Sequence, residues 1–223
     1  NKFNFNVINF SIDDFYKTFF QKKKMAKNTH PLFMTRGVPG THDLTLLNNT
    51  FRNLLKKKFK PVYIPSFDKT VDDRRPKKQW NKIIKKPNII IFEGWCVGAK
   101  HQNNKKLKKP INLLEKISDK NLTWRKKVNN ELKNHYKKTF KLMNKLIFLE
   151  VPSFNYVYKW RLLQEKKLKN KLKKNKIMSK IKIKNFIMHY ERTTRQMIED
   201  LKFKANIVIK LDKKHRLSKI KFN

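Results

Sequence analysis

The stretch Ile89-Ile90-Ile91-Phe92-Glu93-Gly94 decides the fold class of this chain of 223 residues. Four consecutive apolar residues predict a strand that is buried on both faces, as in a parallel sheet covered by helices. The acid and the glycine that follow predict the end of that strand. Apolar runs at 146–149 and 207–209 predict two further strands.

Helical patterns separate these strands. An alternation of apolar and polar residues predicts a first strand at 3–10. Helices are predicted at about 15–27, 44–58, 123–141, 153–174 and 178–201. The remaining segments are a shaped loop at 30–43, an extended piece at 61–65, a polar loop at 67–76, a stretch of little order at 100–122 and a basic tail from Lys213 onward. Because strands and helices alternate, we expect an α/β fold with a mostly parallel sheet flanked by helices.

The composition is strongly basic. The chain has 57 basic and 16 acidic residues, which gives a formal net charge of +41. Such a charge favours nucleic acid as a partner. However, 48 of the basic residues are Lys and only 9 are Arg, while Asn reaches 24 and Ala falls to 3. This bias is also what codon drift in an AT-rich genome produces, so the charge has two interpretations.

Several classes of protein are excluded by composition. A hydrophobic content of 39% and 17 Phe residues supply a core, so the whole chain is not expected to be disordered. A single cysteine, Cys96, excludes a disulfide framework, and its simplest role is that of a small packing residue. The sequence has no apolar run of membrane-spanning length and no recognisable secretion signal, so we expect a cytoplasmic, reducing setting and no membrane contact.

Acidic residues follow the ends of the predicted strands. The pair Asp13 and Asp14 could cap the following helix, or it could supply a base for a substrate hydroxyl and a ligand for Mg²⁺. Glu93 could form an ion pair at the rim of the sheet, or it could reach Mg²⁺ through water. Since ligands bind at the carboxyl ends of strands in open α/β sheets, we expect these acids and Asp68 to meet at one edge.

Arginine and histidine residues accompany glycine and proline in the loops. Arg36, His42 and Asp43 could form a tight turn with a helix cap, or they could line a site for a small polyhydroxylated or carboxylated substrate. Arg74 and Arg75, which stand beside two aspartates, have the same two interpretations.

Three arginines stand on the predicted C-terminal helices. Arg192 and Arg195 are three residues apart and therefore neighbours on one helix face, and Arg161 lies on the preceding helix. These residues could belong to a helical lid that reaches nucleotide phosphates, or they could form ordinary ion pairs between helices.

Eight segments together resemble one known family. They are SIDDFY (11–16), HPLFMTRGVPGTHD (30–43), PSFDKTVDDRRP (65–76), IIIFEGWCVGA (89–99), TWRKKVN (123–129), VPSFNYVYKWRLLQE (151–165), FIMHYERTTR (186–195) and IVIKLD (207–212). In this order they are similar to the P-loop kinases of the D-glycerate 3-kinase type, relatives of uridine kinase, phosphoribulokinase and pantothenate kinase. The resemblance covers essentially the whole chain.

The resemblance implies an ATP-dependent kinase that uses Mg²⁺ and phosphorylates a small hydroxy acid, with D-glycerate as the first candidate. It implies that Asp13 or Asp14 accepts the proton of the substrate hydroxyl, that Asp13 helps to place Mg²⁺, and that Glu93 reaches the metal through water. It assigns the remaining residues to two groups: the acceptor site takes Arg36, His42, Asp43, Asp68, Lys69 and Arg74, and the nucleotide-facing lid takes Arg161, Arg192 and Arg195.

One element of the family is missing from the sequence. No pair of glycines has the spacing of the phosphate-binding motif G-x-x-x-x-G-K-[ST]. We therefore expect that the sequence is truncated at its N-terminus, lacks the first strand, the phosphate loop and its helix, and binds ATP poorly as it stands. An inactive paralogue that has lost the loop is the alternative interpretation. What remains, residues 1–223, is expected to form a single kinase-like domain with substrate-binding loops at about 28–43 and 65–78 and a helical lid at about 153–201.

Overall fold

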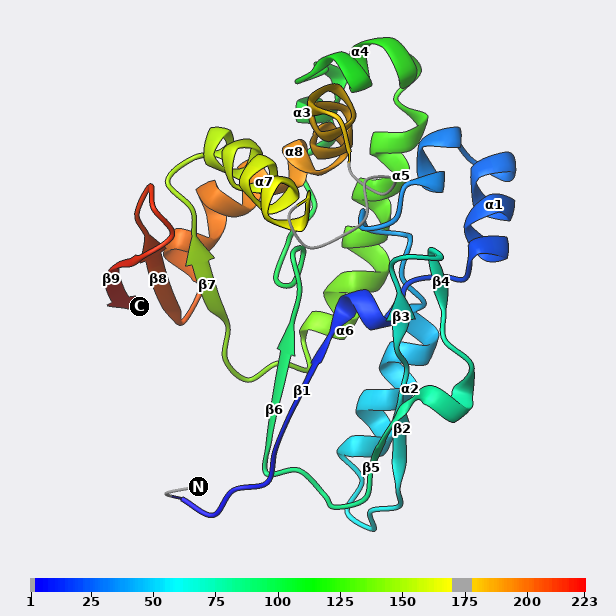
Figure 1. Cartoon of the computed structure of the whole chain (residues 1–223), viewed down its shortest axis with the longest axis vertical. Coiled ribbons are helices and arrows are strands. Elements are labelled where there is room, and N and C mark those ends of the chain that lie inside the picture. Colours follow the sequence, from blue (N-terminus) through cyan, green and yellow to red (C-terminus); the bar gives the residue numbers. More distant parts are fainter. Residues whose placement is uncertain (1–2, 170–177) are drawn as a thin grey trace. The chain divides into compact units, whose positions relative to one another are not determined.

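The computed structural model describes residues 3–169 and 178–223 (Figure 1). The chain divides into two compact units. The first contains Asn1–Val97 and Lys127–Phe140, and the second contains Gly98–Lys126 and Lys141–Asn223. Each unit contains a parallel pair of strands together with helices, which confirms the expected α/β class.

Among its described residues, the first unit contains six strands. Its strands are β1 (Val7–Ser11), β2 (Val62–Ile64), β3 (Phe67–Asp68), β4 (Asp73–Arg74), β5 (Asn81–Ile83) and β6 (Ile89–Glu93). Its helices are α1 (Phe19–Asn28), α2 (Leu44–Leu54), α6 (Lys137–Phe140), the 3-10 turns η1 (Ile12–Phe15), η2 (Pro31–Met34) and η3 (Lys77–Gln79), and the π-helical turn η4 (Leu132–Tyr136). The helix α5 (Thr123–Glu131) begins in the second unit and ends in the first.

The parallel pair β1 and β6 forms the base of the first unit. The two strands are in register from Val7 opposite Ile89 to Ser11 opposite Glu93. Phe10 packs against Phe92 with a centroid separation of 5.4 Å, and a helix covers this face because Phe51 of α2 lies 5.0 Å from Phe92. These contacts place the core on one side of the strand pair.

The expectation of burial on both faces of these strands is wrong. Ile89 is 42% exposed and Ile91 is 52% exposed, while the alternate residues of β1, such as Ile8, are buried. In the second unit, Ile147 and Leu149 of β7 are likewise more than half exposed. A continuous apolar run does not specify which face is covered, because packing partners elsewhere in the chain decide that.

The start of the first predicted helix and the content of the loop predicted at 67–76 differ from the prediction. Ser11 caps the short turn η1, and the helix α1 begins later, at Phe19, with Thr18 as its N-cap. The loop predicted at 67–76 contains the antiparallel hairpin of β3 and β4. The turn of this hairpin includes Asp72 in the left-handed region, with φ of 57°.

The second unit contains β7 (Ile147–Glu150), β8 (Ile207–Leu211) and β9 (Leu217–Phe222), with the helices α3 (Asn104–Lys108), α4 (Leu113–Ser118), α7 (Phe154–Lys169) and α8 (Lys180–Lys204). Strand β8 pairs in parallel with β7 and antiparallel with β9. The segment predicted to have little order thus contains two short helices, and part of the predicted tail forms β9.

The long helices α7 and α8 pack through an apolar cluster of Phe154, Ile183 and Ile187. Part of the helix that was predicted at 153–174, namely residues 170–174, lies outside the described residues. Within the described part of the chain, no helix combines the length and the apolar character that crossing a membrane requires.

Candidate active site

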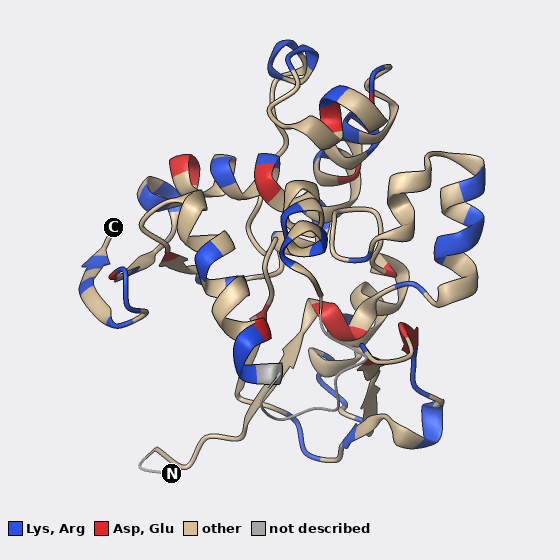
Figure 2. Ribbon diagram, turned by 45° about the horizontal axis from the view of Figure 1, so that its top comes forward, with Lys and Arg blue, Asp and Glu red and all other residues tan. Residues whose placement is uncertain are grey.

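The carboxyl ends of β1 and β6 bring two predicted acidic segments together. Ser11, the last residue of β1, is the register partner of Glu93, the last residue of β6. The turn that carries Asp13 and Asp14 follows Ser11 directly and is drawn in red in Figure 2. The strand-end argument therefore places these acids at the same edge of the sheet.

Asp14 has a structural role in this turn. Its carboxylate accepts hydrogen bonds from the backbone N–H of Ser11 at 3.4 Å and from that of Phe67 at 3.4 Å. Together with the Ser11 hydroxyl, which accepts from Asp13 N–H, it forms a capping box. Burial raises the pKa of Asp14 above its usual value, although the two backbone hydrogen bonds act in the opposite direction. The helix-cap interpretation of the sequence thus fits Asp14.

Asp13 has different surroundings. Its Oδ1 accepts a hydrogen bond from the Tyr16 hydroxyl at 2.6 Å, and its Oδ2 pairs with Lys69 Nζ at 2.7 Å. Burial acts to raise the pKa of Asp13, but the hydrogen bonds from Lys69 and Tyr16 outweigh it and lower the pKa below the usual value. The Lys69 side chain is 58% exposed, so this partner can leave without unfolding its surroundings. Asp13 is therefore an ionised carboxylate whose partner is exchangeable.

Within the described part of the chain, Glu93 does not form the ion pair that was one of its two interpretations. It is exposed at the end of β6, and no hydrogen bond or ion pair of its carboxylate is found among the described residues. The following residue, Gly94, has no room for a side chain, because a Cβ there would lie 2.2 Å from Ile12 Cγ2. The glycine thus allows η1 to pack closely against the end of β6.

The loop that precedes α2 is held against η1 by backbone hydrogen bonds. Lys17 N–H donates to Thr41 C=O at 2.8 Å, and Asp43 N–H donates to Phe15 C=O at 2.7 Å. The Lys17 ammonium group donates to His42 C=O at 2.7 Å, and burial lowers the pKa of this lysine. The loop is therefore a fixed wall beside the acidic turn.

His42 is buried in this wall. Its ring stacks on Tyr16 with a centroid separation of 4.7 Å, and its Nδ1 lies 2.6 Å from the hydroxyl of Tyr136. Burial lowers the pKa of His42 to about 3, so the ring is neutral near pH 7. His42 is thus a neutral hydrogen-bonding group next to Tyr16, whose hydroxyl donates to Asp13.

Arg36 and a buried lysine share one carboxylate. Asp72, in the hairpin turn, pairs with both Lys22 and Arg36. The Lys22 side chain is fully buried, whereas that of Arg36 is 27% exposed. The guanidinium group of Arg36 also lies over the Phe67 ring at 5.8 Å. Lys22 therefore anchors the hairpin, and Arg36 remains at the surface of the same cluster.

The other predicted acceptor-site residues also contribute to local structure. Asp43 accepts from Leu46 N–H as the N-cap of α2, and Arg74 bonds Tyr16 C=O at 2.7 Å and Asp43 at 3.3 Å. Asp68 accepts from Thr70 within the hairpin and from Arg75 at 2.8 Å; its hydrogen bonds with Thr70 lower its pKa. The interpretation of these residues as caps and ion pairs is realised in the structure.

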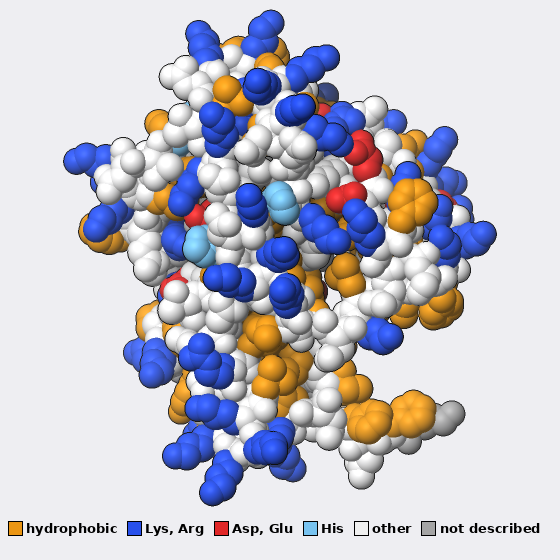
Figure 3. All heavy atoms as spheres, turned by 180° about the vertical axis from the view of Figure 1, so that it is seen from behind, with side chains coloured by type: hydrophobic (Ala, Val, Ile, Leu, Met, Phe, Trp, Pro, Cys, Tyr) orange, Lys and Arg blue, Asp and Glu red, His pale blue; other side chains and the backbone are white. Residues whose placement is uncertain are grey.

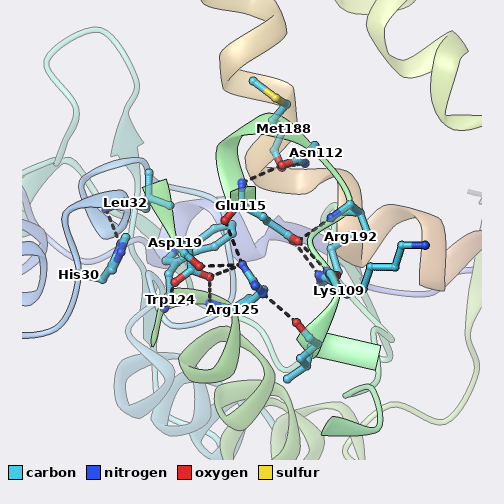
Figure 4. A network of polar contacts seen from close by, with 12 residues as sticks. His30, Leu32, Lys109, Asn112, Glu115, Asp119, Trp124, Arg125, Met188 and Arg192 are labelled. Carbon is cyan, nitrogen blue, oxygen red and sulfur yellow. Dashed lines mark hydrogen bonds and ion pairs between the residues drawn. The ribbon is translucent and has the colours of Figure 1, made fainter. Parts of the chain in front are cut away.

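The arginines of α8 have structural partners within the second unit. Arg192 forms a bidentate pair with the buried carboxylate of Glu115, with distances of 2.7 and 2.6 Å (Figure 4). It also donates to the backbone carbonyls of Lys106 and Lys109. Arg195 pairs with Glu191 at 2.7 Å. The pair of Arg192 with Glu115 joins α8 to α4, as the ion-pair interpretation of the sequence expects, whereas Arg195 pairs within its own helix.

Arg161 of α7 is held in the same way. It pairs with Glu165, one turn later in the helix, at 2.6 Å and lies 5.6 Å from the centroid of the Phe186 ring. The second unit also contains a fully enclosed pair, Arg125 and Asp119, whose side chains are 3% and 1% exposed. The lid role of Arg161, Arg192 and Arg195 remains a proposal.

Three residues at the site were missed at the level of the sequence. Lys22 stands in a run of lysines, Asp72 lies in a polar loop, and Tyr136 is separated by 94 residues from its partner His42. The positive φ of Asp72 is known only from the structure, so it could not mark this residue in advance. No sequence pattern distinguishes Lys22 from the neighbouring lysines.

Asp13 and Glu93 fit Mg²⁺ chemistry only as two carboxylates of a larger set of ligands. Among the described residues, no three His, Cys, Asp or Glu side chains gather in a way that could hold a metal ion. Mg²⁺ in nucleotide-dependent enzymes is held by one or two carboxylates together with phosphate oxygens and water. Asp13 fits such a role once Lys69 moves, and the exposed Glu93 at the same edge can reach a metal-bound water.

Comparison of structures defines the fold. The D-glycerate 3-kinase of Cryptococcus neoformans aligns with 99% of this chain and 81% of its own, with a TM-score of 0.84 and 22% identity. A second solved structure, of the YGR205w protein, covers 97% of this chain with a TM-score of 0.70. The fold is therefore that of an α/β kinase with a parallel sheet.

Comparison of sequences defines the family. The kinase mug58 of Schizosaccharomyces pombe is 36% identical over 195 residues, which are 84% of this chain and 68% of that protein. The chloroplastic D-glycerate 3-kinase of Arabidopsis thaliana is 28% identical over 70% of this chain and 33% of its own length. No family model matches the chain. The chain belongs to the P-loop kinases of the glycerate kinase type, a family of phosphotransferases.

Proposed function

We propose that this protein transfers the γ-phosphate of ATP to a hydroxyl group of a small hydroxy acid, with D-glycerate as the first candidate. Two relatives bear the name D-glycerate 3-kinase. The observation that carries the proposal is the state of Asp13, a carboxylate at the carboxyl end of β1 whose pKa is lowered and whose Lys69 partner is exchangeable. We propose a cytoplasmic, reducing setting for the reaction; Cys96 is a buried free cysteine.

The proposed chemistry uses Asp13 as the proton acceptor. As the hydroxyl oxygen of the substrate bonds to the γ-phosphorus of ATP, its proton passes to a carboxylate oxygen of Asp13. The bond from the γ-phosphorus to the bridging oxygen breaks, and ADP leaves. A carboxylate that is ionised at neutral pH and positioned near the hydroxyl contributes about 10²–10⁴ to the rate. Positioning and neutralisation of charge supply the rest.

The cations around Asp13 favour an anionic acceptor. Lys69 and Arg36 both lie near the acidic turn, and each now pairs with a carboxylate of the protein, Asp13 and Asp72 respectively. A substrate carboxylate offers the same ligand to these groups. The proposed acceptor site also includes His42, Asp43, Asp68 and Arg74, which shape the loops around it.

The proposal includes Mg²⁺ and a nucleotide-facing group. Asp13 and Glu93 would hold the ion, which neutralises the charge of the triphosphate when it is bound. Arg161, Arg192 and Arg195 are the proposed lid residues. Arg192 is bonded to Glu115 and two carbonyls, whereas Arg161 and Arg195 each pair with a carboxylate one turn away on their own helix.

The acceptor is tested with a panel of small compounds. The full-length gene product is incubated with ATP, Mg²⁺ and D-glycerate, glycerol or lactate, and the products are followed by ³¹P NMR. Glycerol lacks the carboxylate and lactate lacks the terminal hydroxyl, so phosphorylation of D-glycerate alone supports the proposal. Efficient phosphorylation of glycerol would mean that the cations do not select a carboxylate, and turnover of none would refute D-glycerate as the substrate.

A second function is favoured by the net charge of +41. Lys and Arg side chains cover much of the face shown in Figure 3, which would suit binding to nucleic acid. Binding to a generic RNA is measured over a series of salt concentrations. Tight binding at physiological salt with a steep salt dependence supports this function, and weak binding that disappears at moderate salt supports the kinase alone.

A further inference from the structure

Tyr136 is a buried residue that none of the functional motifs contains. It is fully buried at the end of the π-helical turn η4, and its hydroxyl has two partners in the structure. It accepts a hydrogen bond from Gly40 N–H at 2.9 Å and lies 2.6 Å from His42 Nδ1. One hydroxyl group thus joins two residues of the proposed acceptor loop.

The direction of the second hydrogen bond follows from the donors and acceptors available. A tyrosine hydroxyl has a single proton to donate. Among the described residues, the only acceptor found for the proton of Tyr136 is His42 Nδ1. Nδ1 therefore accepts, and in a neutral imidazole the proton then resides on Nε2. Burial lowers the pKa of His42, in agreement with a neutral ring.

The Nε2–H group of His42 is left without a partner. It is buried, and no hydrogen-bond acceptor for it is found within the described residues. A buried donor without a partner is unfavourable by about 1–3 kcal/mol, so such groups are rare unless they have a function. The ring itself is fixed, because it stacks on Tyr16, whose hydroxyl donates to Asp13.

The local backbone is built around this contact. Gly40 has a φ of 105°, and a Cβ at this position would lie 3.1 Å from Glu131 Cγ and 3.3 Å from Met25 Cε. The positive φ favours glycine at this position, and its N–H reaches the Tyr136 hydroxyl. π-Helical turns inside longer helices occur frequently at functional sites, and η4 ends at the tyrosine.

We infer that Tyr136 is a positioning residue of the acceptor site, which fixes His42 as the Nε2–H tautomer so that it donates a hydrogen bond to an oxygen of the acceptor substrate. This inference rests on the proposed kinase function for the identity of the substrate, but the tautomer itself does not. Tyr136 acts through His42, and it also holds Gly40, so both sides of the loop depend on one hydroxyl group.

The tautomer is measured directly in the full-length protein labelled with ¹⁵N. Long-range ¹H–¹⁵N correlation at neutral pH distinguishes a protonated ring nitrogen from an unprotonated one, and loss of the signals in His42→Gln assigns them. We expect a protonated Nε2 in the wild type and a changed or mixed tautomer in Tyr136→Phe. A protonated Nδ1 in the wild type, or an unchanged tautomer in Tyr136→Phe, would overturn the inference.

The catalytic consequence is measured by steady-state kinetics. We expect Tyr136→Phe to raise the KM for the acceptor about tenfold and to leave the KM for ATP unchanged. The matched control is Thr139→Val, which removes another buried hydroxyl of the same unit, one that donates to Asn48 at 2.9 Å. This control should lower thermal stability to a similar extent and leave both the tautomer and the KM values as they are. An unchanged acceptor KM in Tyr136→Phe would contradict the positioning role.

A second pair of variants guards against misfolding of Tyr136→Phe. His42→Gln keeps an N–H donor near the Nε2 position, whereas His42→Leu has none. We expect His42→Gln to retain more of kcat/KM for the acceptor than His42→Leu, and equal losses would contradict the donor role. If the gene product phosphorylates no acceptor, the proposed function fails, while the tautomer measurement still decides whether Tyr136 sets the state of His42.

Discussion

Asp13 and Asp119 are both carboxylates paired with a cation, yet their surroundings differ sharply. Asp13 in the first unit pairs with Lys69, whose side chain is 58% exposed. Asp119 in the second unit pairs with Arg125, which is 3% exposed and also donates to the carbonyls of Leu107 and Glu115. A pair with one exposed partner can open for a ligand, whereas an enclosed and fully bonded pair stabilises the fold. The number of partners and their burial therefore distinguish the pair proposed to act in catalysis from the pair that stabilises the fold.

The largest expected effect is at Asp13. The substitution Asp13→Asn removes the proton acceptor, so we expect kcat to fall about 10²–10⁴-fold while affinity for nucleotide changes little. Activity is measured by ADP release and affinity by equilibrium titration. The matched control is Asp200→Asn, which removes the acid of another partly exposed pair with lysine. A loss of kcat below threefold in Asp13→Asn would place the base elsewhere.

The enclosed pair in the second unit is expected to respond in stability. Arg125→Met leaves the buried carboxylate of Asp119 without its charge partner, which should lower the free energy of unfolding by about 3–5 kcal/mol. Urea denaturation followed by circular dichroism measures this loss. Arg195→Met, which breaks a pair whose arginine is 50% exposed, is the control and should change stability by no more than about 1 kcal/mol. Equal effects of the two variants would contradict the distinction between an enclosed pair and an exposed one.

Lys69→Met tests whether the partner of Asp13 is exchangeable and also recruits substrate. The pKa of Asp13 is lowered by its hydrogen bonds with Lys69 and Tyr16, so removing Lys69 raises it. The acid limb of the profile of kcat/KM against pH should therefore move to higher pH. The acceptor KM should rise about tenfold, because one cation is lost. Arg75→Met, which breaks the pair with Asp68, should leave the acid limb in place.

A further expected effect concerns His42 and acid stability. Its pKa is about 3 in the folded protein against an ordinary value of 6.5. Below pH 6.5 the unfolded chain therefore binds a proton that the folded chain does not, and the stability from this group is lost as the pH falls toward 3. Melting temperatures of the wild type and of His42→Gln are compared from pH 7 to pH 4. The wild type should lose more stability over this range, and parallel curves would contradict the buried, neutral state of His42.

The sequence predicted the parts of the site that depend on the ends of strands. Asp13 and Glu93 lie at the same edge because β1 and β6 are parallel and end at paired residues, Ser11 and Glu93, as the general behaviour of α/β sheets predicts. The resemblance to kinases added the acceptor loop and its residues. The alternative roles of Asp14 and Asp43 as helix caps could be named in advance but not separated from function.

Other features could not be predicted because they depend on distant contacts. Glu115 and Arg192 are 77 residues apart, and Tyr136 reaches His42 across 94 residues. Ile91 lies in the most apolar run of the chain and is still 52% exposed. This exposure could not be predicted, because no local pattern indicates which face of a strand finds a partner. Lys22 is buried while adjacent lysines are not, and only the position of Asp72 explains the difference.

The most direct test of the central claim is the stoichiometry of the reaction. The full-length gene product is mixed with Mg²⁺, ATP and D-glycerate, and ADP and phosphorylated glycerate are quantified over time. The account predicts equal amounts of the two products. If ATP is bound but no glycerate is phosphorylated, or if ADP forms without a phosphorylated acceptor, the claim that Asp13 and its loops form a hydroxy-acid kinase site is contradicted.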